Sequence, residues 1–171
     1  MVYRRRRILL SEIDRQCRFA MIAYSDASAA LERRDAERCW YSLQGLIAAA
    51  LQLHRLLWPE PDSSQASAVE LRGALEIPED SPLNQAPLVL SLDLLATLEA
   101  WGSPRPAPSP SNLGTGGLSD ASYAECVRSF DPETGMFTLF GNVVELPALL
   151  NAISDLAQNT EREMQHLREV V

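Results

Sequence analysis

The chain has 171 residues, a hydrophobic content of 46% and a formal net charge of −8, values typical of one globular domain. All 15 of its basic residues are arginine, and 23 acidic residues outnumber them. This balance argues against a protein that coats nucleic acid, because such proteins gain affinity by neutralising phosphates. The longest uncharged apolar run is too short for a helix that crosses a bilayer.

The three cysteines show no pattern that is typical of a metal or redox site. Cys17, Cys39 and Cys126 have neither CxxC spacing nor a Cys/His arrangement, and an odd number cannot all pair within one chain. We therefore expect small, buried thiols in a reducing compartment. The sequence predicts no metal site and no cofactor.

The N-terminal residues 1–7 are strongly basic. The run of four arginines precedes only three apolar residues, which is too few for the apolar segment of a secretion signal. We expect a cytoplasmic protein with a loose N-terminal arm, because chain ends are usually poorly held. The arm is the one basic cluster and a candidate contact for phosphate or an acidic partner through Arg4, Arg5, Arg6 and Arg7.

Two long helices are predicted for the first third of the chain. Residues 8–32 carry apolar side chains at steps of three and four, which is the spacing of one helical face. Asp35 is a plausible N-cap for a second helix over residues 36–57, which Trp58 and Pro59 end. The connection is so short that the two helices must form an antiparallel hairpin.

The middle of the chain predicts two further helices. Ser67 and Glu70 fit a capping box at the start of a short helix that runs to about Leu75. Residues 83–101 are mostly apolar at helical spacing, and Pro87 either begins this helix or kinks it. A helix that is apolar on most sides is central in a bundle or lies at an oligomer interface.

This wide apolar surface predicts a homodimer. The predicted contact lies on the part of the helix that contains Leu88, Leu92 and Leu95. Residues 102–119, which hold four of the 11 prolines, predict a low-complexity loop. The chain as a whole is then a single helical domain with a basic arm and one long Pro/Gly-rich loop.

The C-terminal part predicts a β-hairpin followed by a long helix. Strands at 123–130 and 136–140 flank a turn whose last residue is Gly135, at the position that tolerates positive φ. Phe137, Leu139 and Val143 alternate with smaller or polar neighbours. After a turn at Gly141 and Asn142, the last helix covers about 145–170. The predicted fold is mainly α: an up-down bundle of four or five helices with a small β-hairpin before the C-terminal helix.

No intact catalytic motif is present, so no catalytic residue is predicted. His54 lies on the apolar face of the second helix and has two interpretations. It could line a small-molecule pocket with Trp40, Arg55 and Trp58, because ligands favour aromatic pockets with a few polar groups. The structural interpretation, which we favour, is a core histidine bonded to a backbone carbonyl.

The segments ERCWYSLQGLIAAALQLHRLLWP, LRGALEIPEDSPL and RSFDPETGMFTLFGNVVELPALLNAIS, with a helix ending at Trp101 between them, resemble bacterial all-helical proteins related to the HEPN domain. The resemblance covers about residues 8–160 and implies a helical bundle that dimerises. Many HEPN domains are metal-independent RNases with an Arg-polar-x3–4-His motif. The positions that this motif would occupy here are all apolar: Val89, Leu90, Leu94 and Ala96.

The resemblance therefore implies the fold and the dimer without the activity. The sequence predicts a non-catalytic helical-bundle interaction protein, a degenerate HEPN-like domain that binds a protein partner. Two alternatives stay open. One is a small-molecule binding module that uses the pocket around His54, and the other is a residual RNase that uses His54, Arg55 or the N-terminal arginines.

Overall fold

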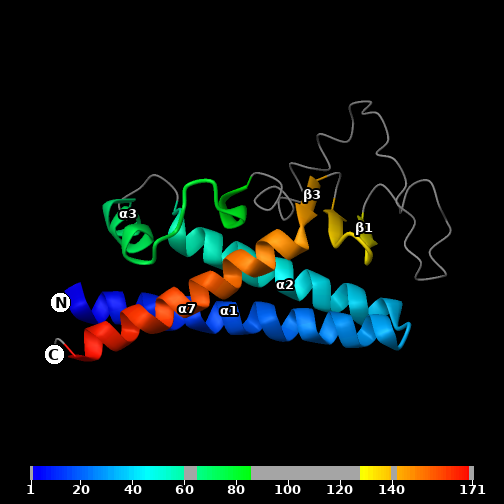
Figure 1. Cartoon of the computed structure of the whole chain (residues 1–171), viewed down its shortest axis with the longest axis horizontal. Coiled ribbons are helices and arrows are strands. Elements are labelled where there is room, and N and C mark those ends of the chain that lie inside the picture. Colours follow the sequence, from blue (N-terminus) through cyan, green and yellow to red (C-terminus); the bar gives the residue numbers. More distant parts are fainter. Residues whose placement is uncertain (1, 60–64, 86–127, 140–141, 170–171) are drawn as a thin grey trace.

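The part of the chain that the structure describes consists of long helices and one small sheet (Figure 1). The computed structural model describes residues 2–59, 65–85, 128–139 and 142–169. Its α-helices are α1 (Val2–Glu32), α2 (Ala36–Leu57), α3 (Gln65–Ala74) and α7 (Leu146–Glu169), with a 3-10 turn η1 (Pro82–Asn84). Strands β1 (Arg128–Asp131), β2 (Met136–Leu139) and β3 (Asn142–Glu145) form an antiparallel sheet in that order. The prediction of a mainly α fold with a small β element before the last helix is confirmed.

The predicted antiparallel hairpin of α1 and α2 forms the long axis of the molecule, and α7 lies across it (Figure 1). Asp35 caps α2 as predicted, because its carboxylate accepts a hydrogen bond from the Arg38 amide at 3.0 Å. The helix ends at Leu57, where Trp58 is the C-cap residue. The faces of the two helices and of α7 meet in one core whose largest members include Leu10, Ile13, Leu43, Leu46, Ile47, Leu53, Phe137 and Leu146.

Two helices begin earlier than the sequence predicts. Helix α1 begins at Val2, so most of the predicted N-terminal arm is helical. A contact between distant parts of the chain, which local pattern does not contain, holds this first part of α1: Arg6 forms an ion pair with Glu163 of α7 at 2.7 Å. Helix α3 begins at Gln65, which places Ser67 and Glu70 inside the helix, so the predicted capping box is wrong.

The sheet has one strand more than the predicted hairpin. Residues 142–145 pair with β2 as an antiparallel strand, where a turn into the last helix was expected. The two valines of this strand differ in exposure: Val144 is buried, whereas Val143 is 41% exposed. Adjacent residues of a strand point to opposite faces, so the pairing register decides which valine reaches the core.

Several predictions concern residues outside the described ranges. Leu83, the first residue of the helix predicted over residues 83–101, belongs to the 3-10 turn η1. The structure describes no residue between 85 and 128. The predictions outside those ranges are the helix to Trp101, its dimer face at Leu88, Leu92 and Leu95, the apolar motif positions Val89, Leu90, Leu94 and Ala96, the loop at 102–119 and Cys126.

The buried thiols of Cys17 and Cys39 should be chemically inert in the folded protein. Both are free and buried. Burial, with a contribution from Asp14, raises the pKa of Cys17 to about 12, and burial with Asp35 raises the pKa of Cys39. At roughly pH 8 iodoacetamide should leave both unmodified until urea unfolds the chain, because the thiolate is the reactive form. Peptide mapping by mass spectrometry measures this, and rapid alkylation of the native protein at either site would contradict it.

Candidate functional site

The predicted site residues of α2 lie in two separate places. The rings of His54 and Trp58 stack with centroids 5.5 Å apart and an interplanar angle of 17°. Trp40 lies fourteen residues before His54 in the same helix, which corresponds to about 21 Å along its axis. The Trp40 ring instead packs against Phe137 of β2 at 5.9 Å. The structure therefore brings His54 and Trp58 together but places Trp40 against Phe137, away from both of them.

His54 joins α2 to the 3-10 turn η1. Its Nδ1 lies 3.0 Å from the carbonyl oxygen of Leu83, and since a carbonyl only accepts, Nδ1 is the donor. Burial lowers the pKa of His54, and the bond to Leu83 partly offsets this, while the charge of Arg55 lowers the pKa further. This arrangement matches the structural interpretation of His54, a histidine bonded to a backbone carbonyl. The Arg55 side chain is exposed.

Arg72 of α3 completes this cluster, and no sequence pattern predicts its role. Its guanidinium lies 5.4 Å from the centroid of the Trp58 ring and donates a hydrogen bond to the carbonyl of Leu57. The last carbonyls of a helix have no partner within the helix, so a cation from another element stabilises them. The cluster of His54, Trp58 and Arg72 thus fastens the end of α2 to α3 and η1.

The lowered pKa of His54 predicts how stability changes with pH. In the unfolded chain His54 binds its proton near the ordinary histidine pKa of about 6.5, before the folded state does. Stability from this group is therefore present above that pH and is lost as pH falls below it. Urea unfolding should show that the free energy of unfolding is lower at about pH 5.5 than at about pH 7.5, and that this difference is smaller in His54→Gln. The same substitution at exposed His166 should keep the full difference, and an unchanged difference in His54→Gln would contradict this role.

The four N-terminal arginines do not form one patch. They lie in the first turns of α1, where successive residues point in directions about 100° apart. Arg4, Arg5 and Arg7 are exposed, whereas Arg6 is half-buried against Glu163. The predicted cluster for phosphate or an acidic partner is thus divided around the helix, with one arginine already paired.

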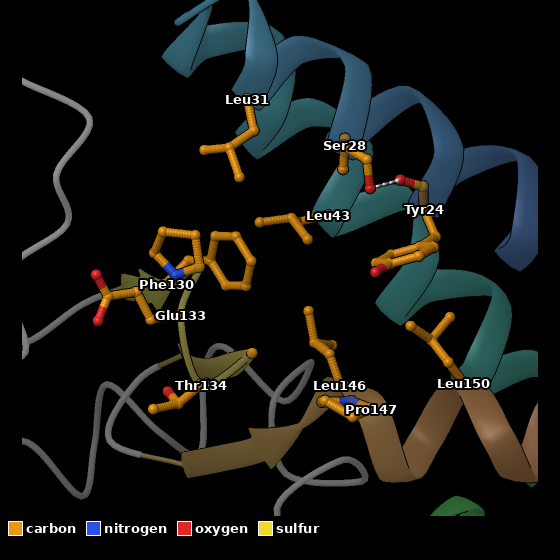
Figure 2. A pocket seen from close by; sticks show the side chains of 13 residues that line it. Tyr24, Ser28, Leu31, Leu43, Phe130, Glu133, Thr134, Leu146, Pro147 and Leu150 are labelled. Carbon is orange, nitrogen blue, oxygen red and sulfur yellow. Dashed lines mark hydrogen bonds between the residues drawn. The ribbon is translucent and has the colours of Figure 1, made fainter.

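A small pocket opens at the other end of the hairpin, between α1, the turn that joins β1 to β2, and the start of α7. Its volume is about 190 Å³. Figure 2 shows Leu31, Leu43 and Leu146 directed towards its interior from three different helices. The hydroxyls of Tyr24 and Ser28 lie on the α1 side. The remaining lining residues are Ala27, Phe130, Pro132, Glu133, Thr134, Gly135, Pro147 and Leu150.

The turn that forms one wall of this pocket is held by its own hydrogen bonds. The Asp131 carboxylate accepts from the Glu133 amide at 2.9 Å and from the Thr134 hydroxyl at 2.7 Å. Both bonds lower the pKa of Asp131, the hydroxyl of Thr134 most strongly. The Leu146 amide donates to the carbonyl of Gly135 at 3.0 Å, which ties the turn to α7. The protein's own hydrogen bonds therefore hold this wall, and a wall that is held in this way reduces the entropy cost of binding.

The sequence predicts the turn and its Gly135 correctly, and the glycine has a φ of +70°. It does not reveal the pocket, because a turn becomes a pocket wall only where distant helices meet it. Within the described ranges, no group of three or more potential metal ligands comes together, and no helix has the length and apolar character needed to cross a membrane. Comparisons of the chain with protein-family models, with curated proteins and with solved structures each find no match.

Proposed function

We propose that this protein is a non-catalytic helical-bundle interaction protein, and that the pocket between α1, the β1–β2 turn and α7 holds one apolar side chain of a protein partner. The observation that carries this proposal is the combination of a small volume, about 190 Å³, with a largely apolar interior. Small-molecule sites usually measure about 300–1,000 Å³. A pocket below that range suits a single anchoring side chain, and such anchors supply most of the energy of many interfaces.

The rim of the pocket indicates the chemistry of the partner. The Tyr24 hydroxyl offers a hydrogen bond, and the Ser28 hydroxyl, which donates to the Tyr24 carbonyl at 3.1 Å, can still accept one. The exposed Glu133 adds a negative charge. Opposite charges across an interface favour the correct partner and suppress the wrong one. The matching segment therefore carries a leucine-like or aromatic anchor next to a lysine or arginine.

The environment of His54 also supports a non-catalytic role. Its Nδ1 is engaged by Leu83, its ring lies on Trp58, and its lowered pKa opposes the cationic form near neutral pH. An RNase that used this imidazole would have to release it from the contact between α2 and η1. We propose a degenerate HEPN-like origin on the sequence resemblance, with which a mainly helical fold is compatible.

A pair of matched variants tests the pocket. Ser28→Trp places a large ring at the rim, whereas Ser25→Trp makes the same change on an exposed position of α1 outside the pocket. With each protein as bait in a bacterial lysate, quantitative mass spectrometry should recover a partner with the wild type and with Ser25→Trp. Ser28→Trp should reduce that recovery at least about tenfold, the effect of about 1.4 kcal/mol.

The experiment is completed with the purified partner. Calorimetric titration should give binding to the wild type and to Ser25→Trp, and weaker binding to Ser28→Trp at equal thermal stability of the three proteins. Equal binding by both tryptophan variants would show that the pocket is not the contact. Binding of a small metabolite in place of a protein would replace the proposed partner class.

A further inference from the structure

Helix α1 carries a second, distinct row of apolar side chains on its outward face. Ile8, Phe19 and Ile22 are 61%, 50% and 60% exposed, although the opposite face of the helix is packed in the core. With Arg5, Glu12 and Arg15 they follow one another at alternating steps of three and four residues. We refer to these six residues, Arg5, Ile8, Glu12, Arg15, Phe19 and Ile22, as the outer seam.

The spacing of the outer seam is that of a helix–helix contact. Alternating steps of three and four keep a row of side chains on one line along two supercoiled helices. A solvated helix face normally has charged residues at such positions, whereas here three of the six members, Ile8, Phe19 and Ile22, are large apolar side chains. Glu12 and Arg15 already form an ion pair at 3.3 Å within the helix, so the charged middle of the seam is neutral.

We propose that a second copy of this chain packs antiparallel on the outer seam. In this arrangement Ile8 lies against the partner's Phe19, and Glu12 lies against the partner's Arg15. The aliphatic stem of Arg5 covers the partner's Ile22. A two-fold axis near the level of Ile13 repeats each contact, so the interface is isologous.

Charge and apolar complementarity select this arrangement. A parallel pair would place Arg15 against the partner's Arg15, and like charges in contact are destabilising. A shifted antiparallel register could pair Phe19 with the partner's Ile22, but it would place Ile8 opposite Arg33, which lies beyond the end of α1. The proposed register pairs all six seam residues within the helix and creates two ion pairs across the axis.

The contact is short, so the dimer should be weak. One helix pair of this length belongs to the low end of specific protein interfaces, and we expect a Kd in the micromolar range. Sedimentation velocity at about 100 μM should therefore give the mass of a dimer, which dissociates on dilution.

Charge reversal tests the register. Glu12→Arg places a positive charge against the partner's Arg15 and should abolish the dimer. Arg15→Glu places a negative charge against the partner's Glu12 and should do the same. The double variant Glu12→Arg/Arg15→Glu restores opposite charges and should restore the dimer. Asp14→Arg is the matched control, because it removes the 2.7 Å ion pair between Asp14 and Arg18 within α1 without changing the seam.

Disulfide trapping provides an independent readout. In a Cys126→Ser background, Ile8→Cys and Phe19→Cys proteins should form a crosslinked dimer when mixed, and each alone should form much less. A wild-type protein that stays monomeric at about 100 μM, or a dimer that survives Glu12→Arg, would overturn the proposal. Either result leaves the pocket test unaffected, because neither Ser25 nor Ser28 belongs to the outer seam.

Discussion

Replacing Phe137 by alanine should lower the free energy of unfolding by about 3–5 kcal/mol, the range for a fully buried phenylalanine. Phe137 is completely buried and lies 5.9 Å from the ring of Trp40 at an angle of 51°. It pairs with Phe130 of β1 and with Val144 of β3, so it is the central side chain of the sheet face that meets the helices. Its removal leaves a cavity where the sheet packs on α2.

Urea unfolding followed by far-ultraviolet circular dichroism measures this loss. Val143→Ala is the control, because Val143 lies on β3 next to Val144 but is 41% exposed. The control should change stability by less than about 0.5 kcal/mol. A loss below about 1 kcal/mol for Phe137→Ala would mean that the sheet is not part of the cooperative core.

Local pattern predicts those parts of this fold that depend on neighbours along the chain. The bounds of α2 follow from Asp35 at its start and from Trp58 and Pro59 at its end. The buried face of α7 follows from residues that recur at steps of three and four, and the structure buries Leu146, Leu149, Ile153, Leu156 and Thr160. These features need no knowledge of the tertiary arrangement, so the sequence is sufficient for them.

The candidate site depended on contacts that local pattern does not contain. Trp40 and His54 share a face of α2, but different elements cover them. Trp40 packs against Phe137 of the sheet, whereas His54 bonds to Leu83 of η1. Helical periodicity specifies direction around an axis, but it does not specify which element covers each turn. The third strand was not predicted for a related reason: residues 142–145, directly before a helix, show no alternation of apolar and polar residues that distinguishes a strand from a turn.

The turn that forms the pocket wall requires glycine at position 135. Gly135 has a φ of +70°, and a Cβ atom there would lie 2.8 Å from Cδ of Pro147. Gly135→Ala should therefore destabilise the protein by about 2–3 kcal/mol, since the left-handed backbone alone costs roughly 1–2 kcal/mol for alanine. If the proposed partner binds in the pocket, the displaced turn should also weaken that binding.

Gly73→Ala should change stability in the opposite direction. Gly73 lies in α3, and nothing approaches within 4 Å of the position of its Cβ. Alanine there should stabilise the protein by about 0.5–1 kcal/mol, because it restricts the unfolded chain and favours the helix. The pair thus compares the same substitution at two backbone conformations by urea unfolding, and equal effects at both sites would contradict the strain at Gly135.

Pro147→Ala separates the two causes of the strain at Gly135. This second substitution removes the Cγ and Cδ atoms that the new methyl group would meet, but it leaves the positive φ unchanged. In a protein that already carries Pro147→Ala, adding Gly135→Ala should lower the free energy of unfolding by only the backbone cost of about 1–2 kcal/mol. Full additivity of the two substitutions would show that the contact is relieved by movement of the turn. The turn would then be able to move, and the pocket would take its final shape only when the proposed partner binds.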